Sequence, residues 1–211
     1  MTWFEVLVEG VSDVPAIHEV LTRRFGLVEG EHFRIHPHQG RGQLPINPLA
    51  RPVPKQRQLL HQLPAKLRGY AKSMPNNAVF LVVVDVDDTP CKQMLDDLRD
   101  MLSKLPVHPK RVLFRLAIEE TESWFIADTA AVQAAFPRAN VAPLRRIEPD
   151  AIVGAWEVLA AAIGVSSDSS GTEKLRWARL ICPHLDLTAP ASPSHRKLIA
   201  GIARERAVSA P

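Results

Sequence analysis

Cysteine is scarce in this sequence of 211 residues. Only Cys91 and Cys182 occur, so neither a disulfide scaffold nor a zinc site built on paired cysteines is available to hold the fold. A chain of this length can bury a sizeable core without such cross-links. The positions of the two thiols leave their pairing open, and a reduced, intracellular setting is the default expectation.

Long apolar runs and a secretion signal are also missing. The apolar, strand-like run from Ala78 to Val84 is far shorter than the ~20 residues that a membrane-spanning helix needs. The N-terminal residues Met1–Glu5 contain neither a basic region nor a long apolar region of a signal peptide. We therefore expect a cytoplasmic protein without a membrane partner.

Acidic residues are absent from one long stretch. Residues 32–78 contain no Asp or Glu but eight Lys and Arg residues, in a chain whose net charge is only +3. The rest of the chain is therefore net negative. Such a basic block favours a polyanionic partner, although a solvated loop and helix face with excess Lys and Arg would look the same.

Strand-like and helix-like segments alternate through the first two thirds of the chain. The strand-like segments are residues 3–8, 32–35, 79–84 and 111–117, and the helix-like segments are residues 14–25, 55–72, 90–105 and 119–136. Such alternation predicts an α/β fold with a mainly parallel sheet flanked by helices.

Two regions depart from this alternation. Residues 37–54 hold five prolines and two glycines and predict a long irregular loop, followed by a basic helix that Pro64 could break. Together they form a basic loop and helix insertion of about residues 37–73 within an α/β domain of residues 1–136. Residues 137–211 show helical patterns only, at 149–164, 172–180 and 194–206, and predict a helical C-terminal extension.

Acidic side chains follow three of the predicted strands. Glu9 follows the first strand, and Asp13 lies four residues later. Asp85, Asp87 and Asp88 follow the most apolar strand, and Glu119, Glu120 and Glu122 follow the next. Because ligand sites of open parallel sheets lie at the carboxyl ends of the strands, these carboxylates are expected to converge. Carboxylates forced together repel one another unless a cation lies among them, and Mg²⁺ and Mn²⁺ prefer such oxygen ligands.

A simpler interpretation exists for each acidic residue taken alone. Asp and Glu are common at helix starts, so Asp13 and Asp88 could simply begin helices. Four acidic clusters at equivalent positions favour a metal site over this alternative.

These segments resemble a known family. The runs Val6–Asp13 and Val82–Asp88 are similar to the Glu-Gly and Asp-x-Asp motifs of the Toprim domain, which occurs in topoisomerases, primases and the OLD (overcoming lysogenization defect) nucleases. The run Ala117–Asp128 is similar to a segment of stand-alone Toprim-like proteins, the domain-of-unknown-function family 4276 type. The stretches from His36 to Gly42 and from Cys182 to Leu185 also resemble that group.

The resemblance implies Mg²⁺-dependent or Mn²⁺-dependent phosphodiester hydrolysis of DNA or RNA, on a Toprim-like, Rossmann-like sheet. Glu9 would act as general acid/base or metal ligand, and Asp85 and Asp87 would hold the metal. Asp13 fits a position that helps to bind a second ion in the OLD-like branch. Either Glu120 or Glu122 would complete that second site, so one or two ions are expected.

Further residues have expected roles beside this centre. The OLD pattern uses a downstream lysine, for which Lys174 is a candidate, with a surface helix lysine as the alternative. His36 and His38 would be a base, a phosphate contact or a ligand, unless they are incidental loop residues. Tyr70 is the single tyrosine, so backbone contacts without sequence reading are expected, and Trp124 is expected in the core. The candidate contacts to a phosphate backbone lie in the basic block; they are Arg41, Lys55, Arg57, Lys66 and Arg68.

The resemblance also implies a partner, because such proteins are often encoded beside an ATPase. It would make the protein an effector of an ATPase-coupled defence against phage or plasmids. One rival is a catalytically silent metal- and nucleic-acid-binding module for that ATPase. Another is a HAD-like phosphatase, because Asp85 to Thr89 resembles its DxDxT motif with Asp85 as nucleophile; that reading gives Glu9 no role.

Overall fold

The computed structural model describes residues 2–86, 89–165 and 171–208. In this part of the chain the strands form a four-stranded parallel sheet in the order β2-β1-β3-β4. Their bounds are Phe4–Val8 for β1, Phe33–Pro37 for β2, Val79–Val86 for β3 and Val112–Ile118 for β4. The predicted α/β fold with a mainly parallel sheet is confirmed.

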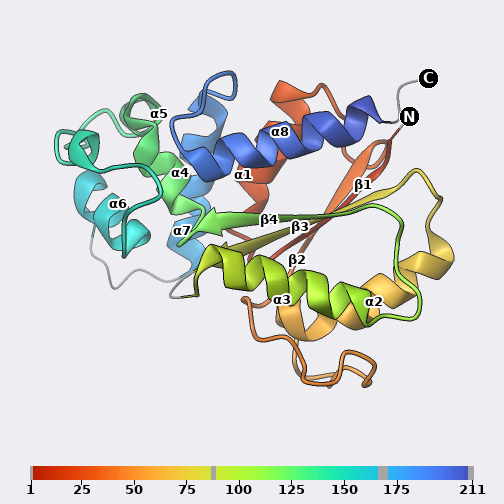
Figure 1. Cartoon of the computed structure of the whole chain (residues 1–211). Helices are drawn as coiled ribbons and strands as arrows, with labels where there is room; N and C mark the ends of the chain where they lie inside the picture. The colour runs from red at the N-terminus through yellow and green to blue at the C-terminus, as the bar shows by residue number, and fades with distance from the viewer. Residues whose placement is uncertain (1, 87–88, 166–170, 209–211) are drawn as a thin grey trace.

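Helices cover both faces of the sheet (Figure 1). On one face lie α2 (Leu59–Ser73) and α3 (Cys91–Ser103). On the other lie α1 (Val14–Glu19), which continues as the π-helix η1 (Val20–Arg24), and α8 (Pro193–Ala207).

The remaining helices gather near the carboxyl ends of the strands (Figure 1). They are α4 (Glu122–Ala127), α5 (Thr129–Ala135), α6 (Ala155–Ile163), α7 (Gly171–Ile181) and the short 3-10 turns η2 (Leu144–Arg146) and η3 (Cys182–His184). Of these, α6 and α7 belong with α8 to the helical extension predicted for residues 137–211, which is therefore present. Its boundary near residue 136 stays a prediction, since these helices pack onto the same core as the strands.

The central strands are buried on both faces. In β3, Val79, Leu81 and Val83 face the core under α1 and α8, whereas Phe80, Val82 and Val84 face the core under α2 and α3. This alternation explains the continuous apolar run, which is typical of a doubly covered parallel strand. Asp85 is the charged exception in β3.

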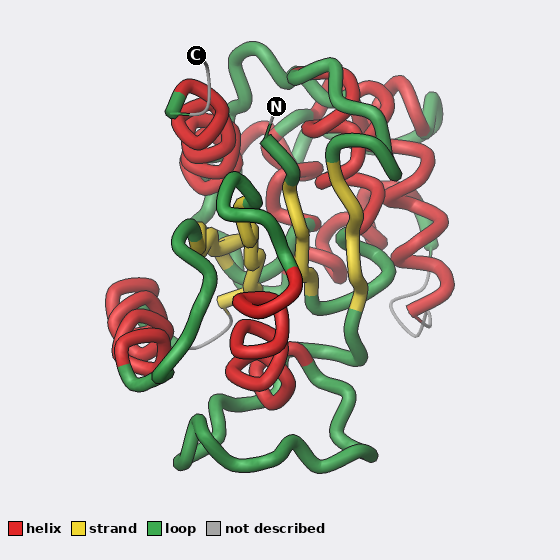
Figure 2. Tube along the Cα trace, turned by 90° about the vertical axis from the view of Figure 1, so that its right-hand side faces the viewer, coloured by secondary structure: helices red, strands yellow, loops and turns green. Residues whose placement is uncertain are grey.

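Two predicted helices differ from those in the structure. The basic helix begins at Leu59 rather than Lys55 and continues through Pro64 without a break, so the preceding loop reaches residue 58 and extends beyond α2 (Figure 2). The helix predicted for residues 119–136 is wrong as one element: it divides into α4 and α5. Asp128 causes the division, because its carboxylate accepts a hydrogen bond from the backbone N–H of Ala131 and starts a new helix.

The C-terminal helix is anchored to α4 through an aromatic stack. The Trp124 ring lies parallel to the His195 ring at 4.7 Å between centroids, and Trp124 Nε1 donates to Ser194 Oγ at 2.8 Å. Trp124 is 1% exposed, which confirms its expected place in the core. Cys91 and Cys182 are both free thiols, and none of the described helices is long and apolar enough to cross a bilayer.

The buried His195 should make the protein sensitive to acid. Burial lowers the pKa of His195 to about 4, from 6.5, with a small opposing effect of Asp150. Between these pH values the unfolded chain binds the proton and the folded chain does not, so the free energy of unfolding falls as the pH falls. We expect His195 to contribute a loss of about 3 kcal/mol between pH 7 and pH 4.

The measurement is urea unfolding at several pH values between 7 and 4. His195→Phe removes the titrating group and should flatten this part of the profile, while His184→Gln, at an exposed histidine, should leave it as in the wild type. A profile equally steep in His195→Phe would show that another group causes the acid sensitivity.

Candidate metal centre

Glu9 and Asp85 lie side by side at the carboxyl ends of neighbouring strands. Glu9 directly follows β1 and is 8% exposed, and Asp85 is the penultimate residue of β3. Glu9 Oε1 accepts a hydrogen bond from the backbone N–H of Asp85 at 2.8 Å. In the order β2-β1-β3-β4, the chain runs from β1 outward to β2 on one side and from β3 outward to β4 on the other. The strand order therefore reverses between β1 and β3, and open α/β sheets bind their ligands at such a point.

Asp13 joins the end of β1 to the end of β4. Its Oδ2 accepts from the backbone N–H of Gly10 at 2.8 Å, and its Oδ1 accepts from Thr121 Oγ1 at 3.0 Å. The carboxylate makes no capping hydrogen bond to α1, so helix capping does not explain it. Thr121, which sequence reasoning missed although it lies inside the acidic run, is fully buried here.

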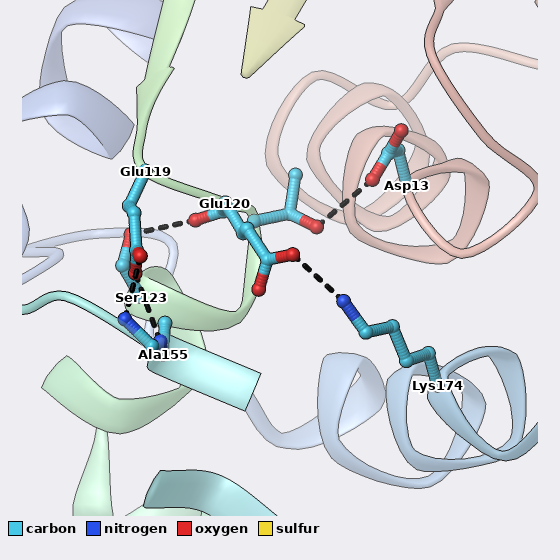
Figure 3. Close-up of polar contacts among 8 residues, drawn as sticks. Asp13, Glu119, Glu120, Ser123, Ala155 and Lys174 are labelled. Atoms are coloured by element: carbon cyan, nitrogen blue, oxygen red, sulfur yellow. Dashed lines mark hydrogen bonds and ion pairs between the residues drawn. The ribbon is translucent and has the colours of Figure 1, made fainter. Parts of the chain in front are cut away.

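Glu119 points away from the other carboxylates. Its φ of 62° turns the chain at the end of β4, and its carboxylate accepts hydrogen bonds from the backbone N–H groups of Gly154 and Ala155 at 2.5 and 2.8 Å. These groups lie at the start of α6, where a negative charge is favourable. Figure 3 shows Glu119 bound to α6 and Glu120 directed toward Lys174. Glu119 is thus an anchor for the helical extension.

Lys174 of α7 reaches the acidic cluster. Its Nζ donates to Glu120 Oε1 at 2.7 Å (Figure 3). The same Nζ lies 4.9 Å from the centre of the Trp156 ring. Lys174 is therefore more than a surface lysine of a helix. No pattern in the sequence pointed to Trp156, because its contact with Lys174 depends on the packing of α6 against α7.

Two oxygens of the cluster lack partners. Glu120 Oε2 and Glu122 Oε1 are buried and accept no hydrogen bond within the described part of the chain. Glu122 itself is only 3% exposed. Because a buried polar atom without a partner is costly, these oxygens indicate a place for a positively charged or hydrogen-bonding ligand.

The protonation behaviour of the cluster shows how closely its carboxylates interact. Burial raises the pKa of Asp85 well above its usual value, and the charges of Asp13 and Glu9 raise it further. Burial also raises the pKa of Glu122 to about 7, although Lys174 opposes the rise. Burial lowers the pKa of Lys174, but the charges of Glu122 and Glu120 outweigh it and raise the pKa overall. One ammonium group therefore compensates only part of the negative charge.

The donor set fits a hard divalent cation. Its described members are carboxylates from three strand ends, the oxygen ligands that Mg²⁺ and Mn²⁺ prefer. No three His, Cys, Asp or Glu side chains of the described residues already surround a common metal position. Asp87, the second residue of the Asp-x-Asp pair, lies outside the described residues together with Asp88.

The basic block is tied to this centre. Arg41 Nη1 donates to the backbone carbonyl of Asp85 at 3.2 Å, and the backbone N–H of Gly40 donates to the carbonyl of Glu9 at 2.9 Å. Arg68 donates to the carbonyls of Pro48 and Ala50 and thereby holds the long loop.

The other predicted contacts of the block differ in exposure and partners. Lys55 and Arg57 are exposed, and Lys66 is half-buried. His36 donates to Glu5 at 2.6 Å, and His38 Nδ1 donates to the carbonyl of Val8 at 2.9 Å. Glu5, 5% exposed within β1, is a buried charge that sequence reasoning did not single out.

Solved structures of similar fold come from OLD proteins. The chain is similar to the C-terminal region of the Xanthomonas campestris pv. campestris OLD protein phased with iodine, with a TM-score of 0.50 and 13% identity, over 99% of this chain and 97% of that chain. The platinum-phased structure of the same region gives 0.50 and 12%, over 98% and 95%. The C-terminal region of the Burkholderia pseudomallei OLD protein gives 0.48 and 12%, over 98% of each chain. At such identities the two matches with a TM-score of 0.50 show the fold alone, and they confirm the expected OLD-like architecture.

Sequence comparison places the chain in a family. No curated protein matches it significantly. The family described as Domain of unknown function (DUF4276) matches residues 8–203, which include β2, β3, β4, the acidic cluster and most of α8. The relationship expected from the sequence is thereby confirmed, and the chain belongs to the DUF4276 family.

Proposed function

We propose that this protein is a nuclease that hydrolyses phosphodiester bonds of DNA or RNA with Mg²⁺ or Mn²⁺. The observation that carries the proposal is the convergence of acidic side chains from three strand ends. Two of these side chains, Glu120 and Glu122, which both follow β4, have a buried oxygen without a partner in the described part of the chain. The fold likeness to the C-terminal region of OLD proteins supports it.

The residues take distinct parts in this proposal. Asp85 and Asp87 hold a first ion, and Asp13 with Glu120 or Glu122 holds a second. Glu9 serves as a ligand or as the group that moves a proton at the attacking or leaving oxygen. A bound divalent ion supplies Lewis-acid stabilisation of the charge that develops on the phosphoryl oxygens.

The basic block would hold the polyanionic substrate beside these carboxylates. Arg41 is best placed for this, since its loop is bonded to the backbone of both Glu9 and Asp85. We further propose an ATPase partner and a role in defence against phage or plasmids, which rest on the resemblance of the sequence to stand-alone Toprim-like proteins.

The test is cleavage of supercoiled plasmid, single-stranded DNA and single-stranded RNA with Mg²⁺, Mn²⁺ or EDTA. Asp85→Asn should lower metal-dependent cleavage on the order of 10³-fold, as expected for loss of a metal-binding carboxylate. Asp96→Asn makes the same chemical change at an exposed residue of α3 and should cut like the wild type.

Cleavage that survives Asp85→Asn would contradict the assigned centre. A third outcome is that no version cuts, while calorimetry shows Mg²⁺ binding by the wild type and none by Asp85→Asn. The protein is then either a silent metal-binding module or a nuclease that needs its partner. Adding a co-encoded ATPase to the cleavage reaction would distinguish these two.

A further inference from the structure

A second feature of the molecule is a hollow on the basic side of the acidic cluster. It has a volume of about 620 Å³ and lies among the end of β2, the long loop and α2. Its polar lining includes His36, His38, Arg57, Gln62 and Lys66, and the lining contains no Asp or Glu among the described residues. An open, cationic hollow of this kind is suited to an anion.

The two cationic side chains of the hollow lack direct polar contacts in the described part of the chain, although the charge of Glu5 acts on Lys66. The side chains of Arg57 and Lys66 form no hydrogen bond or ion pair with any other residue that the structure describes, whereas Arg68 is bonded to carbonyls of the loop. Charged hydrogen-bond donors without partners at a concave surface indicate a ligand with many hydrogen-bond acceptor oxygens, such as a phosphate group.

His38 adds an unpartnered polar atom. Because its Nδ1 donates to the carbonyl of Val8, its Nε2 is left for another partner. This Nε2 is buried and has none in the described part of the chain. A buried imidazole nitrogen without a partner indicates that this wall of the hollow receives a polar group.

The buried Glu5 lies behind the hollow and holds its inner wall. It accepts hydrogen bonds from Trp3 Nε1 at 2.9 Å and from His36 Nε2 at 2.6 Å. Burial raises the pKa of Glu5, but these hydrogen bonds outweigh it and lower the pKa overall. Glu5 therefore stays ionised, and its hydrogen bond orients His36. Its negative charge acts on Lys66. Because Arg57 adds a second positive charge, the hollow remains net positive.

The hollow adjoins the acidic cluster directly. The backbone N–H of His38 donates to the carbonyl of Val8 at 3.1 Å, one residue before Glu9. Val11, two residues after Glu9, lies in the wall of the hollow. When the phosphodiester bond to be cut lies at Glu9 and Asp85, a neighbouring phosphate of the same nucleic-acid strand can thus lie in the hollow.

We propose that this hollow is a phosphate site that holds the nucleic-acid strand next to the bond to be cut, with Arg57 and Lys66 as its ionic contacts. This inference rests on the proposed function and adds to it a specific place for a non-reacting phosphate. The phosphate can belong to the backbone or to a strand end, and two kinds of oligonucleotide distinguish these sources.

The test measures binding without cleavage. Fluorescently labelled single-stranded DNA and RNA oligonucleotides, with a 5′-phosphate or a 5′-hydroxyl, are titrated with the wild-type protein in EDTA at several salt concentrations. Arg57→Gln with Lys66→Gln should weaken binding about 10-fold and lower the slope of log affinity against log salt by about 1 to 2, since each lost contact with a single strand removes about 0.7. Arg57→Gln alone, at an exposed residue, should give part of the effect without risk to folding.

Arg138→Gln is the matched control, because it makes the same change as Arg57→Gln at an exposed arginine outside both the hollow and the basic block. It should change affinity less than about 2-fold, since a charge that makes no phosphate contact adds little to the salt slope. Equal losses for Arg138→Gln and Arg57→Gln, or no binding by the wild type, would overturn the proposal. A preference for the 5′-phosphate assigns the site to a strand end, and equal binding assigns it to the backbone. Binding in EDTA by a protein that cuts no substrate in Mg²⁺ or Mn²⁺ would leave the phosphate site standing, and the cleavage test with the partner ATPase would then decide the nuclease activity separately.

Discussion

Glu9→Gln is expected to lower metal-dependent cleavage on the order of 10³-fold while leaving the fold intact. The glutamine keeps an oxygen that can accept the hydrogen bond from the backbone N–H of Asp85, which Glu9 Oε1 accepts at 2.8 Å. It removes the negative charge and the ability to take a proton, the two properties that a ligand or a general base requires. A loss of this size corresponds to about 4 kcal/mol of transition-state stabilisation.

The measurement is the initial rate of cleavage in Mg²⁺ and in Mn²⁺, beside thermal unfolding without metal. Glu148→Gln, at an exposed glutamate, is the control and should match the wild type. A Glu9→Gln protein that folds normally and still cuts within about 10-fold of the wild type would exclude Glu9 as ligand and general base, because removal of either function costs more.

Trp124→Ala is expected to give the largest loss of stability, about 3–5 kcal/mol. Trp124 is 1% exposed and is among the largest fully buried side chains. The substitution empties the space against His195 and leaves Ser194 Oγ without its indole donor. Because Trp124 lies on α4 two residues after Glu122, the same change should also disturb the acidic cluster.

Equilibrium unfolding in urea measures this loss. Trp124→Phe keeps an aromatic ring against His195 and removes the hydrogen bond to Ser194, so a smaller loss of about 1 kcal/mol plus a modest cavity cost is expected. If Trp124→Ala were no less stable than Trp124→Phe, the stack would not hold α8 against α4.

The positions of the strand-end carboxylates could be predicted from the sequence alone. Glu9 and Asp85 follow apolar runs whose length and β-branched composition mark buried strands. Parallel strands bring such positions to one edge, and the structure places Glu9 directly on the backbone of Asp85. The apolar pattern of the two strands, together with the rule that parallel strands end at the same edge of a sheet, was sufficient to predict this pair of positions.

The division of the helix after β4 could not be predicted in the same way. The apolar spacing from Glu119 to Phe136 is helical throughout. In the structure, however, one carboxylate oxygen of Asp128 caps a new helix. The other oxygen accepts a hydrogen bond from the backbone N–H of Asp186 at 2.8 Å. The competing hydrogen bond comes from a residue far along the chain. Periodicity contains no information about it.

The sequence by itself determined the alternation of strands and helices, the acidic strand ends and the basic block, because each depends on residues within a few positions of one another. Tertiary structure decided how those groups are used. It turns Glu119 toward α6 and Glu120 toward Lys174, which lies 54 residues away. It commits Arg68 to the loop and leaves Arg57 and Lys66 facing a hollow. Such pairings depend on how distant helices pack on the sheet, and packing is a property of the whole folded chain rather than of any local run of residues.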